Sequence, residues 1–194
     1  MMYKIGLLLL FVSSLHNLVA QHHGANGQGY ADSVNAGIIK TDTMRGSPHR
    51  VAMGNIGDAH IHIEYGSPGV KGRMIWGGLV AFDRVWAAGA HNATIINFGK
   101  DVYWGGKKIP AGTYGFFTIR GKNKWIIILN KNSKMHLADD YDEKEDVARV
   151  EVKPETLDRS IQRLTYIVTD KGNKKGAVLM QWDKMQVSIP VELN

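Results

Sequence analysis

Cysteine is absent from all 194 residues of the chain. This absence excludes disulfide bonds, thiolate zinc sites, a cysteine nucleophile and a lipid-modified N-terminal cysteine. A fold without disulfides depends on its hydrophobic core, and a chain of this length can bury a sufficient one. The composition is 44% hydrophobic and 22% charged, which is ordinary for a globular protein and excludes a disordered or fibrous chain.

Long apolar runs are equally scarce. The run at residues 5–12 follows Lys4, and the segment ends on the small residue Ala20, just before Gln21. The run is too short to cross a bilayer and is typical of a secretory signal. We therefore predict a signal peptide at residues 1–20, with a retained N-terminal anchor as the alternative. An export signal without cysteine predicts a periplasmic or secreted protein, with no transmembrane segment after signal removal.

Cations outnumber acids but form no stripe. The chain holds 24 Lys and Arg against 18 Asp and Glu, a formal net charge of +6. Lys4 is the only charged residue of the predicted signal, so the remainder carries 6 − 1 = +5. Because the cations are scattered, nucleic acid is not an expected partner, and weak attraction to anionic envelope polymers is the favoured meaning of the charge.

Helical periodicity is also rare, and no amphipathic helix longer than about two turns is predicted. Instead, about ten short strands recur at the spacing typical of sandwiches and barrels. The clearest alternation places Ala59, Ile61 and Ile63 on one side of a strand and the polar residues between them on the other. We therefore predict an all-β fold, a two-sheet antiparallel β-sandwich of about ten short strands.

The domain boundaries follow from the same patterns. Residues 21–55 are largely polar and lack sustained periodicity, which predicts a flexible N-terminal arm, and residues 56–194 are predicted to form a single β-sandwich domain. Within that domain, Gly105-Gly106 suits the positive φ angles of a two-residue hairpin loop. Asp183-Lys184 leaves little room between the last two apolar segments, which predicts two adjacent antiparallel strands there.

Four titratable residues form the most suggestive constellation. His60 and His62 lie two apart on a predicted strand, so their imidazoles share one face, and Glu64 extends that face. His91 lies in a loop that could fold back as a third nitrogen ligand. Three such ligands with an open position would suit a divalent metal such as zinc, with Glu64 as fourth ligand or general base. The alternative is a polar sheet face with solvated histidines.

A second set of residues could bind a ligand without catalysing a reaction. Lys71 and Arg73 stand in the glycine-rich stretch 66–73, whose backbone and charges could cradle an anion. Trp76 and Trp86 could stack on sugar rings. The alternatives are a glycine-dependent turn with solvated cations and an aromatic core. We treat the four as predicted ligand-binding residues for a small molecule or an envelope glycan.

Several motifs resemble domain-of-unknown-function family 2911. They include Tyr65-Gly66-Ser67-Pro68, Lys71-Gly72-Arg73, the Ile-Trp-Gly-Gly-Leu-Val run at 75–80, residues 105–114 and residues 125–130. The resemblance covers about residues 56–191. It implies an exported, Bacteroidota-type protein with no settled activity, and it transfers no catalytic residue. In one departure from the family pattern, Ala87 and Asn92 replace an Arg and a Glu, and His91 appears between them, which fits either a metal-binding variant or a repacked loop.

Three classes of function are compatible with these patterns. The first is a non-catalytic envelope module that binds a ligand. The second is a metal-dependent enzyme, hydrolase-like, with His60, His62 and His91 as ligands. The third is a structural component of the envelope. Whether the histidines converge on one point, and whether aromatic rings are exposed in a row, distinguishes these classes.

Overall fold

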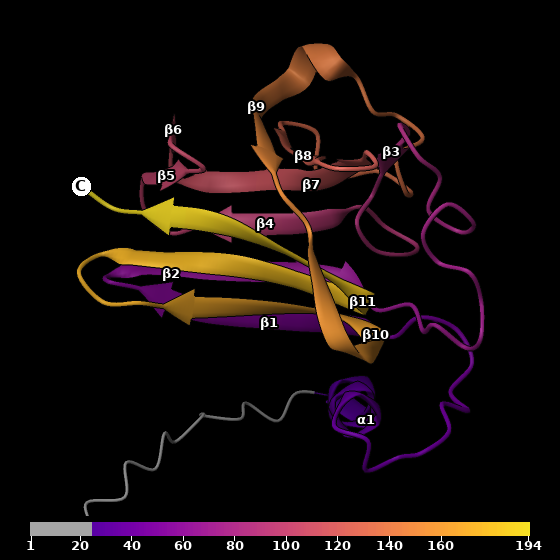
Figure 1. The fold of residues 1–194 in the computed structure, drawn as a ribbon. Helices are drawn as coiled ribbons and strands as arrows, with labels where there is room; N and C mark the ends of the chain where they lie inside the picture. The colour runs from indigo at the N-terminus through magenta and orange to yellow at the C-terminus, as the bar shows by residue number, and fades with distance from the viewer. Residues whose placement is uncertain (1–24) are drawn as a thin grey trace, which may run out of the picture.

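The computed structural model describes residues 25–194, so the predicted signal peptide lies outside the described residues. The described chain forms eleven strands, one α-helix and one short 3-10 helix. Figure 1 shows the strands arranged in two layers, and each layer is an antiparallel sheet. This arrangement confirms the predicted all-β sandwich.

The larger sheet contains seven strands. They run in the order β1-β2-β4-β7-β8-β9, and β3 pairs with β7 beside this path. The strands are β1 His49–Ile56, β2 Ala59–Gly66, β3 Val85–Trp86, β4 Thr94–Phe98, β7 Gly112–Arg120, β8 Trp125–Asn130 and β9 Asp146–Val152. The 3-10 helix η1, Glu143–Glu145, leads into β9.

The smaller sheet has four strands in the order β10-β11-β5-β6. They are β10 Glu155–Asp170, β11 Lys175–Glu192, β5 Val102–Trp104 and β6 Lys107–Ile109. Gly105 and Gly106 join β5 to β6 with φ angles of 55° and 85°, which confirms the predicted two-residue hairpin. The sheet therefore combines one long hairpin, β10 and β11, with one short one.

The prediction of two separate strands around Asp183-Lys184 is wrong. Strand β11 continues through both residues as one 18-residue element. Asp183 has a φ of 50° and pairs with Ile161, where the β10–β11 register shifts on both sides. Such irregularity is characteristic of a β-bulge, which bends a strand without ending it. The interruption in the apolar pattern is thus a bulge and not a turn.

The core lies between the two sheets. Ile61 and Ile63 of β2 are fully buried, as their alternation predicts, and they belong to one large apolar cluster that also takes in Trp104 of β5 and Trp182 of β11. Each sheet contributes side chains from every second position, and the sandwich is closed by this shared layer.

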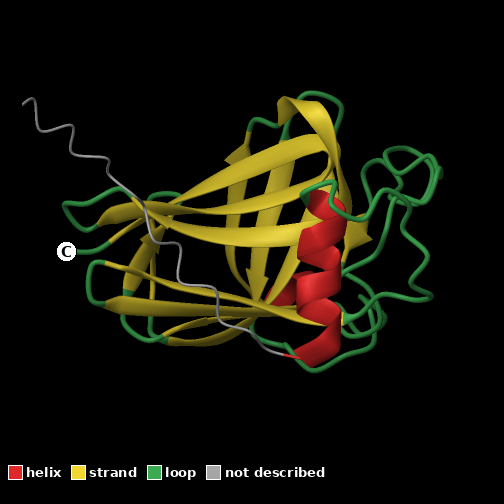
Figure 2. Ribbon diagram, turned by 90° about the horizontal axis from the view of Figure 1, so that it is seen from below, coloured by secondary structure: helices red, strands yellow, loops and turns green. Residues whose placement is uncertain are grey.

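Residues 25–35 form a helix where a flexible arm is predicted. Helix α1, Ala25–Asn35, packs on β10 and β1, and Figure 2 shows it crossing the strands at one end of the sandwich. Its own Ala31 and Val34 are buried against the sandwich. The helix has no strong apolar stripe, so its sequence carries little periodic signal; polar contacts to two buried arginines hold it instead. Part of the same predicted arm, residues 49–55, belongs to β1.

The first of these arginines, Arg50 of β1, is 3% exposed and ion-paired with Asp32 of α1. It also donates a hydrogen bond to Thr165 Oγ1 at 3.3 Å and lies over the Tyr65 ring at 5.8 Å. The helix is therefore tied to both sheets through one guanidinium group.

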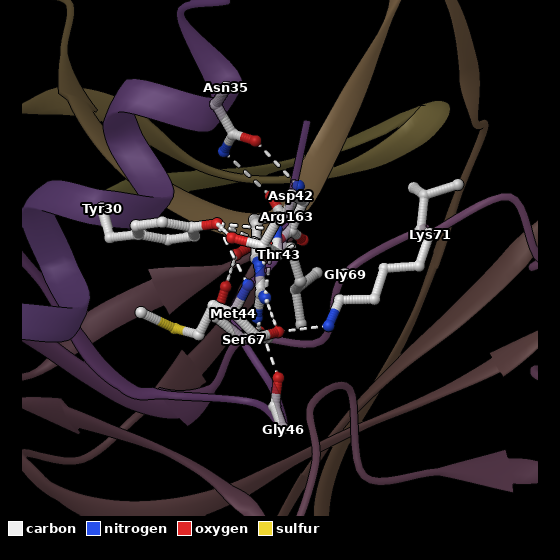
Figure 3. A network of polar contacts seen from close by, with 12 residues as sticks. Tyr30, Asn35, Asp42, Thr43, Met44, Gly46, Ser67, Gly69, Lys71 and Arg163 are labelled. Carbon is white, nitrogen blue, oxygen red and sulfur yellow. Dashed lines mark hydrogen bonds and ion pairs between the residues drawn. The ribbon is translucent and has the colours of Figure 1, made fainter. Parts of the chain in front are cut away.

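Arg163 of β10 is the second and is completely buried (Figure 3). Its guanidinium pairs with the Asp42 carboxylate, with Nε 2.7 Å from Oδ2 and Nη2 2.8 Å from Oδ1. It also donates to the carbonyl oxygens of Met44, Gly46 and Ser67. Burial opposes ionisation of Asp42, but the hydrogen bond and charge of Arg163 outweigh it and lower the pKa of Asp42 below its ordinary value. This arginine fastens the segment after α1 to the sandwich.

We predict that Arg163→Met destabilises the fold by about 3–5 kcal/mol, because the substitution leaves the buried Asp42 carboxylate and three carbonyls without their donor. Urea denaturation followed by fluorescence measures the loss. Arg159→Met on the same strand is the matched control; Arg159 is exposed and donates a single bond, to the Asn35 carbonyl, so its loss costs about 0.5 kcal/mol. Equal destabilisation by the two variants would contradict the anchoring role of Arg163.

Candidate functional site

The outer face of the larger sheet carries most of the candidate residues. Strand β2 turns His60, His62 and Glu64 away from the core, in register with β1 on one side and β4 on the other. His62 lies between Met53 and Asn97 in one cross-strand row, and Glu64 lies next to Ile95 in the following row. Strand pleating alone therefore places this polar set on one surface.

Only part of that outer face is covered. On β7 and β8 it presents Phe117 and Ile128, which are fully buried in a second apolar cluster with Ala93 and Met135. Tyr141 packs edge-on against Phe117 at 5.2 Å. The rest of the face, over β1, β2 and β4, remains open, and Met53 is 44% exposed. A hollow forms where the covered and open parts meet.

The main hollow has a volume of about 520 Å³. Its apolar wall is formed by Tyr65, Gly66, Ala90, Ala93, Ile95 and Met135, and its polar lining by Ser47, His49, Glu64, His91, Asn92, Ser133 and Lys134. A second hollow of about 340 Å³ is lined by His60, His62, Glu64, Ile95, Asn97 and Thr113. Because the two share Glu64 and Ile95, we treat them as one site and call it the histidine groove.

Glu64 lies at the centre of the groove between two imidazoles. His49 Nε2 is 3.3 Å from Oε2 of Glu64, and His62 Nε2 is 3.1 Å from Oε1. Each carboxylate oxygen can thus accept a hydrogen bond from one imidazole N–H. His60 is displaced from this pair; its Nδ1 is 2.9 Å from Oδ1 of Asn55, and its ring centroid is 6.3 Å from that of His62.

The segment 87–92 holds His91 at the other end of the groove. A Cβ atom on Gly66 would lie 2.2 Å from the Ala90 carbonyl oxygen, so this close approach requires glycine at position 66. His91 itself has a φ of 67°, and its carbonyl accepts a 2.7 Å hydrogen bond from the Leu137 N–H. The segment is therefore held on one side by β2 and on the other by residues 135–138.

A buried tyrosine supports the same segment from inside the core. The Tyr166 hydroxyl donates a 2.7 Å hydrogen bond to the Ala88 carbonyl, and Thr94 Oγ1 donates to the same oxygen at 3.1 Å. Burial raises the pKa of Tyr166 well above its ordinary value, so its hydroxyl keeps its proton and remains a donor. Ala88, with a φ of 52°, is stabilised by two donors.

The structure does not bring His60, His62 and His91 together as a metal site. Within residues 25–194, no three His, Asp or Glu side chains are grouped closely enough to hold a metal ion. His60 and His62 line the smaller hollow, whereas His91 lines the larger one beside Gly66. Gly66 is four residues beyond His62, which is about 13 Å along a strand. The loop bearing His91 does fold back on β2, but it meets the strand near Gly66. That point is too far from His62 for the histidines to share one metal ion.

The predicted ligand-binding residues lie outside the groove. Trp76 packs against Trp125 at 5.0 Å, and Trp86 stacks on Trp182 at 5.7 Å. All five tryptophans of the chain are buried or half-buried, so none provides an exposed stacking surface.

The two cations of the set make backbone contacts. Lys71 Nζ donates to the Met44 carbonyl, and Arg73 donates to the carbonyls of Gly69 and Val70. These contacts fit a turn held by its own cations, and neither side chain lines the two hollows.

Several groove residues carry no signal in the sequence. His49 enters through the β1–β2 pairing, which sets it opposite Gly66. Ser133, Lys134 and Met135 enter because the chain after β8 crosses the outer face. The apolar run of β7 and β8 offers the one available clue, because Phe117 and Ile128 require a cover on the outer side.

Together these features define a two-sheet antiparallel β-sandwich with an open, histidine-lined groove on the outer face of its larger sheet. The chain belongs to the family described as "Protein of unknown function (DUF2911)", whose sequence model matches residues 47–191. This match confirms the resemblance seen in the motifs. No curated protein and no solved structure matches the chain. Among the described residues, no helix has both the length and the apolar character needed to cross a bilayer.

We predict that Gly66→Ala destabilises the fold by about 1–3 kcal/mol, because the added methyl group meets backbone atoms of Ala90 that cannot rotate away. Amide exchange at Leu137 should accelerate as the segment 87–92 is displaced. Gly29→Ala is the control: its Cβ would meet no atom within 4 Å, and an exposed helical glycine gains about 0.5–1 kcal/mol on replacement by alanine. Unchanged stability and unchanged exchange in Gly66→Ala would show that the contact does not position His91.

Proposed function

We propose that the chain is an exported, non-catalytic binding protein whose histidine groove holds a small amphipathic anion. The observation that carries the proposal is the main hollow itself, with a volume of about 520 Å³. That volume is within the range of small-molecule sites, which combine apolar walls with a few polar groups. The groove has this composition, since its lining combines aliphatic and aromatic groups with several polar and titratable ones.

The charge of the groove favours an anion. Lys134 has no ion-pair partner, and the His91 imidazole makes no hydrogen bond, among the described side chains. His49 and His62 both face Glu64, the one acid that lines the two hollows. Four histidines line the two hollows, so the groove offers several N–H donors to an anion.

Binding is better supported than catalysis. Glu64 and His49 have side chains that are 40% and 65% exposed. Catalytic acids and bases work in desolvated surroundings that shift their proton affinity and strengthen electrostatic interactions. Groups as exposed to solvent as these two are suited to contacting a ligand and lack the desolvation that catalysis requires.

Benzenesulfonate tests the proposal, because it joins an apolar ring to an anion whose charge is constant at the relevant pH. We predict amide chemical-shift changes confined to the groove. His91→Ala with Lys134→Ala should weaken binding about tenfold or more through lost charge-assisted contacts. Nuclear magnetic resonance titration measures both effects.

Two comparisons make this test decisive. Benzenesulfonamide is neutral and nearly the same shape, so it should bind more weakly. Lys122→Ala removes an exposed cation at the β7–β8 turn, away from the groove, and should leave affinity unchanged. Equal binding of sulfonate and sulfonamide, or shifts centred outside the groove, would sink the proposed function.

The export part of the proposal rests on residues 1–20. A signal peptidase that cuts after Ala20 leaves a mature chain that begins at Gln21. We predict this N-terminus in intact-mass measurements of the protein recovered from the natural host's envelope or medium. Recovery of the uncut chain would instead identify residues 1–20 as a retained anchor.

A further inference from the structure

Between β2 and β3 the chain exposes three large apolar side chains. Met74 is 75% exposed, Leu79 52% and Phe82 38%. The segment loops out at the right-hand end of the sandwich in Figure 1. We call these three residues the apolar loop tip. Soluble surfaces expose single apolar side chains routinely, but a group of three on one loop marks an interaction site.

The loop is built to present these side chains. The Leu79 N–H donates to the Met74 carbonyl at 3.0 Å, and the Val80 N–H donates to the Ile75 carbonyl at 2.8 Å. Ile75 and Val80 are each only 2% exposed. Since these two residues already occupy the inward positions, Met74 and Leu79 cannot turn into the core without breaking both hydrogen bonds.

Glycine and an arginine fix the rest of the tip. A Cβ atom on Gly78 would lie 2.4 Å from the Met74 carbonyl oxygen, and one on Gly77 would lie 2.8 Å from the Phe82 ring. The Arg120 guanidinium lies 4.0 Å from the centroid of the Phe82 ring and 5.6 Å from that of the Trp76 ring. The tip is thus a supported projection that carries all three apolar side chains on one loop.

The charges around the tip are mainly positive. Lys71, Arg73 and Arg84 are exposed cations of the same segment, and Asp83 is its one acid. Arg120 adds a further cation beneath Phe82. Apolar side chains surrounded by cations complement a surface that is anionic outside and apolar within.

We propose that the apolar loop tip docks the protein onto an anionic lipid bilayer. Met74, Leu79 and Phe82 enter the boundary between headgroups and acyl chains, and the flanking cations contact anionic headgroups. A stable contact with another protein uses about 20–30 residues a side, far more than this projection offers. A bilayer needs no matching shape, so a small tip suffices. This docking is independent of the histidine groove.

Flotation of the full chain with lipid vesicles tests the proposal. Vesicles of phosphatidylcholine mixed with phosphatidylglycerol should bind the chain, and added salt should weaken the binding. Met74→Ser with Leu79→Ser should reduce partitioning about tenfold or more, because two apolar side chains no longer leave water. Ile38→Ser with Met53→Ser, which alters exposed apolar residues on other segments, is the matched control and should bind as wild type does.

The apolar run at residues 5–12 is present in every variant, so the difference between variants reports on the loop. Leu79→Trp gives a direct reading: brominated phosphatidylglycerol should quench its fluorescence more than that of the unaltered chain. Equal partitioning of the test and control variants overturns the proposal. Self-association lost only in Met74→Ser with Leu79→Ser, seen by sedimentation velocity without vesicles, would also overturn it and assign the tip to contact between copies of the chain.

Discussion

The larger sheet has two faces, and only one of them can be buried by the smaller sheet. Its outer face must therefore be covered by another part of the chain or remain exposed to water. The sequence divides that face into an apolar part over β7 and β8 and a polar part over β1, β2 and β4. Phe117 and Ile128 draw the chain after β8 across the apolar part, where Met135 joins them. The polar part needs no cover, because His62 and Glu64 remain hydrated. The histidine groove exists because the cover ends where the polar part begins.

In a chain without cysteine, two buried arginines link distant segments, as disulfides do in other proteins. Arg50 ties α1 to the sandwich through Asp32, and Arg163 ties the following segment through Asp42. Isolated buried charges are costly, but each guanidinium has a carboxylate partner, and Arg163 satisfies several carbonyl oxygens as well. The result is a specific attachment, since no other side chain offers that number of donors in one plane.

Local patterns predicted the fold better than they predicted the site. The alternation at Ala59, Ile61 and Ile63 arises within one strand, and the Gly105-Gly106 loop arises within one turn. Both features could therefore be predicted from the local sequence. The helix α1 could not, because its attachment depends on arginines that are 18 and 128 residues away from their partners Asp32 and Asn35 in the sequence. His49 and Lys134 are similar cases, since each reaches the groove through pairing or crossing of distant segments. His91 illustrates the limit most clearly: the sequence indicates that its loop returns to β2, but not that the loop meets the strand at Gly66, through Ala90.

The groove and the apolar loop tip belong to one continuous segment of chain. Residues 67–92 leave the groove at Gly66, form the loop with its tip, pass through β3 and return to Gly66 at Ala90. The close approach of Ala90 to Gly66 closes this excursion at its base, and Tyr166 secures the base to the core through Ala88. Hydrogen bonds and aromatic packing stiffen the excursion along its length. The position of His91 in the groove and the position of Met74 at the tip therefore follow from the same anchored base, so a substitution at Gly66 alters both, whereas one at the tip leaves the groove intact.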